Sequence, residues 1–101
     1  MSRTHAIRAI GIAWFRNARD FQAIRAASRD GFRLPPSFAA WQRRAEQLRQ
    51  TLLRQGAIVE QVYLDPGQFT DWCRTNGLDI DANARIRFAS EAVARKYTET
   101  H

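Results

Sequence analysis

Residues 6–15 have the sequence AIRAIGIAWF, and the alternation of large and small side chains within them governs the architecture expected for the chain. In an extended segment the large apolar side chains share one face and the small ones share the other, namely Ile10, Ile12 and Trp14 against Ala9, Gly11 and Ala13. A strand that is apolar on both faces is usually covered on both. We therefore expect a strand over 6–15, with a helix packed closely against its small-residue face.

A second strand is expected over residues 57–64, AIVEQVYL, where Ile58, Val62 and Leu64 fall on one face. Two helices are expected between the strands. Asn17 can cap the first, over about 18–30, which Gly31 ends.

The second of these helices is expected over 38–55, because Ser37 is a good N-cap and Gly56 a good terminator. Its apolar residues recur at steps of three and four, which predicts one packing seam: Phe38, Trp41, Ala45, Leu48 and Leu52. The seam covers fewer than three heptads, so it indicates a core helix rather than a coiled coil.

Two further helices are expected after the second strand. The segment DPGQ at 65–68 has the residue types of a capping box, and the helix that follows should end near residue 76, before Gly77. Asp79 or Asp81 then caps the last helix, whose buried side is expected to contain Ile86, Phe88, Ala89 and Val93.

The expected fold is thus a single globular α+β domain over residues 1–101, with a two-stranded sheet and four helices in the order β-α-α-β-α-α. A two-stranded sheet is marginal alone and leaves open edges. Either the four helices cover one face of it, or two copies join their edges into a four-stranded sheet, and we favour the homodimer. The pattern does not decide whether the strands are parallel or antiparallel.

The residue inventory argues against most kinds of catalytic chemistry. The chain has one cysteine and two histidines, His5 and His101, which lie at opposite ends and cannot supply a zinc site of the usual spacing or the base of a serine triad. No phosphate-binding glycine motif occurs, and no apolar run approaches the roughly 20 residues that span a bilayer. We therefore expect no enzyme, no cofactor, no metal and no membrane partner.

Residues 69–88, FTDWCRTNGLDIDANARIRF, invite comparison with a DNA-reading helix-turn-helix. Cys73, Gly77 and Leu78 fit that motif, but Asn83 stands where an apolar anchor is required. Asp79 and Asp81 would also face the phosphates. We favour a simpler interpretation, in which one helix turns into an Asp-capped second helix and Cys73 is a small buried apolar residue.

Positive charge is concentrated in the first half of the chain. Residues 1–54 carry eleven arginines against three acids, a net +8, whereas residues 55–101 carry five cations against seven acids, a net −2. The positive charge of the first half suggests that the partner is a polyanion or an acidic protein. The arginines that we expect to contact phosphates lie on the two helices between the strands: Arg19, Arg25, Arg29, Arg43 and Arg54.

The favoured function is a small, non-catalytic, cytoplasmic module that binds nucleic acid or another polyanion through these arginines. The alternative is a protein–protein interaction module, such as a small inhibitor or accessory subunit, that acts through its apolar helix seam or a strand edge.

Overall fold

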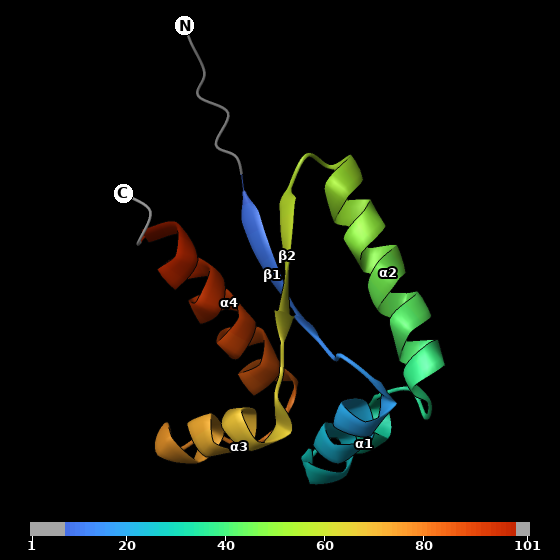
Figure 1. Cartoon of the computed structure of the whole chain (residues 1–101), viewed down its shortest axis with the longest axis vertical. Helices are drawn as coiled ribbons and strands as arrows, with labels where there is room; N and C mark the ends of the chain where they lie inside the picture. The colour runs from blue at the N-terminus through green and yellow to red at the C-terminus, as the bar shows by residue number, and fades with distance from the viewer. Residues whose placement is uncertain (1–7, 99–101) are drawn as a thin grey trace, which may run out of the picture.

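The computed structural model describes residues 8–98, in which two strands are flanked by helices (Figure 1). In chain order the elements are β1 (Ala9–Trp14), α1 (Ala18–Ala27), the short 3₁₀ helix η1 (Gly31–Arg33), α2 (Phe38–Arg54), β2 (Ile58–Tyr63), α3 (Pro66–Thr75) and α4 (Ala82–Thr98). The predicted α+β order β-α-α-β-α-α is confirmed. The strand direction, which the sequence left open, is parallel.

One face of the sheet is covered by α4. The register pairs Gly11 with Glu60, so the small-residue face of β1 continues into the side of β2 that contains Ile58, Glu60 and Val62. A Cβ atom added at Gly11 would lie 2.6 Å from the carbonyl oxygen of Ala89 and 2.6 Å from a methyl group of Val93. The predicted close approach of a helix to this face is therefore confirmed.

The other face of the sheet is turned towards α2. The ring centroids of Trp14 on β1 and Trp41 on α2 are 5.1 Å apart, and α2 packs mainly against β2. Figure 1 shows α2 and α4 on opposite sides of the strand pair. The four helices therefore do not all cover the same face of the sheet. That arrangement was one of the two considered from the sequence, and the structure does not show it.

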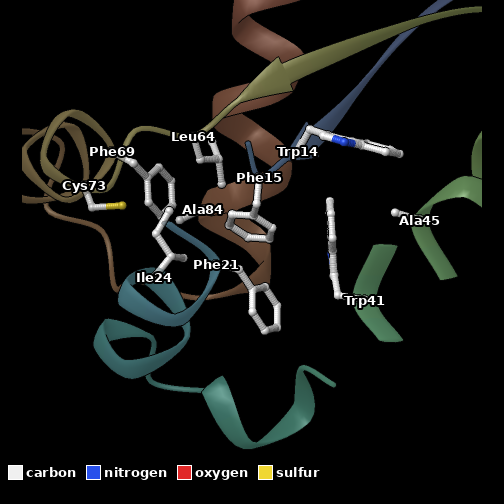
Figure 2. Close-up of a cluster of buried hydrophobic side chains, with 10 residues drawn as sticks. All are labelled: Trp14, Phe15, Phe21, Ile24, Trp41, Ala45, Leu64, Phe69, Cys73 and Ala84. Carbon is white, nitrogen blue, oxygen red and sulfur yellow. The ribbon is translucent and has the colours of Figure 1, made fainter. Parts of the chain in front are cut away.

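The hydrophobic core lies at the carboxyl ends of the two strands, where α1 and α3 begin (Figures 1 and 2). Large side chains from both strand ends and three helices meet there, among them Trp14, Phe15, Phe21, Trp41, Leu64 and Phe69. The amino ends of the strands are covered less well, since Ile58 remains exposed. The chain is therefore packed most tightly at one end of the sheet.

The predicted helix starts are confirmed by their capping hydrogen bonds. The backbone N–H of Asp20 donates to Asn17 Oδ1 at 2.8 Å, that of Ala40 to Ser37 Oγ at 3.1 Å, and that of Gln68 to Asp65 Oδ2 at 2.9 Å. Each bond satisfies one of the amide groups that a helix start leaves without a partner.

The expected end of the first helix was wrong by about three residues. The helix ends at Ala27, because the N–H of Arg29 donates to the Ile80 carbonyl oxygen at 2.7 Å and so leaves the helical ladder. Gly31 instead begins η1, where an added Cβ would lie 2.1 Å from the carbonyl oxygen of Arg25.

Two apolar positions were also assigned wrongly. Ile86 is 63% exposed, and the neighbouring Arg85 is buried in its place beside Ala89 and Val93. Leu48 of the α2 seam is 49% exposed, although Trp41 and Ala45 are buried as predicted. Leu48 is exposed because the N-terminal half of α2 contacts the core, whereas its C-terminal half extends past the core beside β2.

Candidate nucleic-acid interface

One side of α2 combines arginines with neutral hydrogen-bonding side chains. At 100° per residue its members occupy a sector of about 120°, and all are exposed. We call this surface the α2 flank, and it consists of Arg43, Arg44, Gln47, Gln50, Thr51 and Arg54. A surface hollow runs along it, and Arg43 and Arg54 line that hollow together with the acid Glu46.

The α2 flank retains most of its positive charge. Within residues 8–98, neither Arg43 nor Arg44 forms an ion pair, and Arg54 donates to Thr51 Oγ1 at 3.3 Å. The one acid of α2, Glu46, pairs with Arg49 at 2.7 Å. Hydrogen bonds from Gln50 and then Arg49 hold the pKa of the Glu46 carboxyl below its ordinary value. Three of the four α2 arginines therefore present charge that the helix does not compensate.

The arginines predicted on and after α1 are in more varied surroundings. Arg19 is exposed and has no ion pair among the described residues. Arg25 is half-buried, and its Nε is buried without a hydrogen-bond partner in the described part of the chain. Arg29 is exposed but pairs with Asp79 at 2.7 Å. Of this group, Arg29 is the one whose charge is directly compensated.

Three of the five predicted arginines line surface hollows, and these hollows are separate. Arg43 and Arg54 share the hollow along α2, whereas Arg29 lines another between η1 and the start of α4, together with Arg33. Arg44 was not among the predicted residues. Arg44 lies 40° from the seam residue Leu48 around the helix axis, and this position beside the seam could have identified it as a member of the α2 flank.

The corner between α3 and α4 agrees with the simpler interpretation of residues 69–88. Gly77 ends α3 with a positive φ of 65°, and the N–H of Leu78 donates to the Cys73 carbonyl oxygen at 2.8 Å. Asp81 then caps α4 by accepting a hydrogen bond from the N–H of Ala84 at 2.9 Å. Leu78 and Ile80 pack against the core and fill the corner.

A second carboxylate, that of Asp30, and a buried guanidinium, that of Arg85, lie at the start of α4. Asp30 accepts the N–H of Ala82 at 3.0 Å and pairs with Arg85, which is only 8% exposed, at 3.4 Å. Burial raises the pKa of Asp30, but the Ala82 amide and Arg85 outweigh that effect and leave the pKa lowered. Arg85, which lies on the segment compared with a DNA-reading helix, therefore serves as an internal tether between α4 and the end of α1.

Cys73 lies inside the core and is 1% exposed. Its burial, and then the negative charge of Asp81, raise the pKa of the thiol above its ordinary value. The protonated thiol thus packs as a small apolar group, as the sequence indicated.

No group of three potential metal ligands gathers within residues 8–98, and His5 and His101 lie outside that range. In the same part of the chain, no helix has both the length and the apolar character needed to cross a bilayer.

Comparison with known proteins gives a family but no function. Neither a curated protein nor a solved structure matches the chain. A family model described as a domain of unknown function matches residues 2–101, nearly the whole sequence. The chain therefore belongs to the DUF8829 family.

Proposed function

We propose that the protein is a non-catalytic nucleic-acid-binding module whose α2 flank contacts phosphate groups. The observation that supports this most directly is that Arg43, Arg44 and Arg54 share one exposed side of a helix and have no acidic partner among the described residues. Guanidinium groups bind phosphate oxygens with two parallel hydrogen bonds, so such a surface suits a polyanion.

The dimensions of the α2 flank suit contact with several successive phosphates. Arg43 and Arg54 are separated by eleven residues, which corresponds to about 17 Å along the helix axis. Of the neutral side chains between them, Gln50 already donates to Glu46 at 3.0 Å, and the Thr51 hydroxyl donates to the Gln47 carbonyl oxygen at 3.0 Å. The Gln47 side chain can donate to phosphate and sugar oxygens. Such contacts position a protein on nucleic acid and carry no direct sequence information. We therefore expect binding with little sequence preference.

The arginines near α1 are expected to contribute less to this binding. The carboxylate of Asp79 compensates Arg29, and Arg25 is half-buried. Arg19 is exposed and adds to the general positive field. The proposed role requires a cytoplasmic location. A single free cysteine is consistent with that location, because disulfide bonds are rare in the cytosol.

The test is fluorescence anisotropy with a labelled DNA duplex and a labelled single-stranded RNA, measured between about 50 and 200 mM salt. Three phosphate contacts give a log-log slope of about −2.7 for duplex DNA, which corresponds to a roughly 40-fold loss of affinity over that range. The variant Arg43→Gln/Arg44→Gln/Arg54→Gln should lose most of the slope. A control variant, Arg74→Gln/Arg87→Gln/Arg95→Gln, removes the same formal charge away from α2, where Arg74 pairs with Asp71 and Arg87 with Glu91, and should retain the slope.

Two results would contradict the proposal. One is the absence of binding to either probe at the lowest salt concentration. The other is an equal loss of affinity in the two triple variants, because it would show that net charge alone, rather than the α2 flank, attracts the nucleic acid.

Protein–protein contact is a second candidate function, and the exposed apolar side chains near β2 favour it. Leu48 and Leu53 on α2 and Ile58 and Tyr63 on β2 are all exposed. Contact through these side chains would persist at high salt, whereas phosphate binding would not.

A further inference from the structure

The β2 strand has an open edge. In the described sheet β2 pairs with β1 alone, and no other described segment forms backbone hydrogen bonds with it. Ile58, Gln61 and Tyr63 are exposed, whereas no residue of β1 from Ala9 to Trp14 is. Of the two strands, β2 is therefore the more accessible to another chain.

The ladder to β1 determines which backbone groups of β2 point to this edge. The N–H of Ile58 donates to the Arg8 carbonyl oxygen at 2.8 Å, and the N–H of Leu64 donates to that of Trp14 at 3.0 Å. Because alternate residues of a parallel strand bond to the same neighbour, the even-numbered residues 58–64 bond to β1. The N–H and C=O groups of Val59, Gln61 and Tyr63 consequently point outward.

This edge lacks the features that usually prevent strand pairing. Residues 58–63 contain no proline, lysine or arginine, and each of them has a partner in a regular register with β1. The one charge, Glu60, lies on the α4 face, where it accepts from Lys96 at 2.9 Å and from Tyr97 at 2.7 Å. The hydrogen bond from Lys96 has the largest effect on the pKa of the Glu60 carboxyl and lowers it, and the hydrogen bond from Tyr97 lowers it further. Within residues 58–63, no charged side chain therefore points to the edge, although the Arg16 guanidinium lies 5.1 Å from the centroid of the Tyr63 ring at the carboxyl end of the strand.

We propose that two copies of the chain pair through antiparallel β2 strands, with Gln61 on the two-fold axis. The axis must be perpendicular to the sheet, so that residues on the same face pair with one another. Among such registers, this one pairs all three outward residues, Gln61 with Gln61 and Val59 with Tyr63 of the second copy. Each of these hydrogen-bonded pairs exchanges two bonds. Aromatic and β-branched side chains also make favourable cross-strand pairs.

The size of the contact indicates a weak dimer. A six-residue edge is about 20 Å long, and with the helical layers on both faces the contact is about 25 Å deep. This is roughly 500 Å² per copy and 1,000 Å² in total, which is the lower limit for a specific interface. The two α2 helices come to lie on the same face of the four-stranded sheet. We expect a dissociation constant in the roughly micromolar range.

The salt dependence of the dimer separates it from nucleic-acid binding. Each α2 carries four arginines and one glutamate, so the two helices repel one another when they are brought together. Screening weakens that repulsion. The dimer should therefore tighten as salt rises, whereas binding to the α2 flank should weaken, so that either proposal can fail without the other.

The first test is sedimentation velocity of the full chain over a concentration range of about 1 to 300 µM. The wild-type chain should show a monomer–dimer equilibrium. Gln61→Lys sets two ammonium groups opposite one another at the axis and should raise the dissociation constant at least about tenfold. Thr75→Lys adds the same charge at the exposed end of α3 and should leave the constant unchanged. Circular dichroism shows that each variant is folded.

A second test uses crosslinking, which traps even a weak dimer. Opposed Cα atoms in a hydrogen-bonded antiparallel pair are about 5.5 Å apart, which suits a disulfide. Gln61→Cys should form a covalent dimer under mild oxidation, and Thr75→Cys should not. A wild-type chain that stays monomeric throughout the range overturns the proposal. A dimer that Gln61→Lys leaves intact and Gln61→Cys does not trap overturns it as well, because another surface must then join the copies.

Discussion

Gly11→Ala tests whether the close contact between β1 and α4 governs this fold. The added Cβ would lie 2.6 Å from the carbonyl oxygen of Ala89, whereas ordinary contacts begin at 3.4 Å. Because the obstacle is helix backbone, α4 must move by about 0.8 Å, the difference between those two distances. The Val93 methyl group, also at 2.6 Å, adds a second obstacle on the same side.

The expected cost follows from two opposing effects. Overpacking of this kind costs about 1–3 kcal/mol, and replacing glycine by alanine restores about 0.4–1 kcal/mol by restricting the unfolded chain. We expect a net destabilisation of about 1.5 kcal/mol, which for a chain of this size lowers Tm by about 6–12 °C. Thermal unfolding followed by circular dichroism measures this shift.

Gly67→Ala is the matched control. The nearest atom to a Cβ at Gly67 is an Asp65 carboxylate oxygen at 3.5 Å, an ordinary contact, and the site is in the first turn of α3. This variant should be as stable as the wild-type chain or slightly more stable. If Gly11→Ala matched Gly67→Ala in Tm, α4 would not pack on the small-residue face, and the reasoning from residues 6–15 would be refuted.

Four further predictions concern individual side chains. Asp30→Ala leaves the buried guanidinium of Arg85 without its carboxylate, with Ser28 Oγ as a remaining neutral acceptor at 3.1 Å, and should cost about 3 kcal/mol in urea unfolding. An effect below about 0.5 kcal/mol would mean that the pair does not tether α4. The pKa of the Asp30 carboxyl is lowered in the folded state, so its contribution to the free energy of unfolding should be complete above the ordinary carboxyl pKa and be lost as the pH falls through the folded value. The stability of the wild-type chain should therefore fall more steeply on acidification than that of Asp30→Asn. Cys73 should react with a thiol reagent far more slowly in the folded chain than in denaturant, and equal rates would show that the thiol is accessible. Ser37→Ala should cost about 1 kcal/mol by removing the cap on the Ala40 amide, and an unchanged urea midpoint would argue that the cap contributes nothing.

Features that depend on residues close together in the chain could be predicted from residue types alone. Asn17, Ser37 and Asp65 each cap an amide three residues ahead, so the helix starts could be read directly from the residue types. The small face of residues 6–15 likewise predicted the helix that packs on it, because alternation reports which side a helix can approach.

Features that join distant segments depend on how the helices and strands pack in space, and local patterns did not predict them. The parallel strand direction depends on how two helices cross over the sheet. The burial of Arg85 requires Asp30, which is 55 residues away, and the neutralisation of Arg29 requires Asp79, 50 residues away. Leu48 belongs to a regular seam and is nevertheless exposed, because α2 extends past the core that buries Trp41. Local patterns indicate which side of an element is apolar, but they do not indicate which distant element packs against it. That packing decides which arginines have an acidic partner.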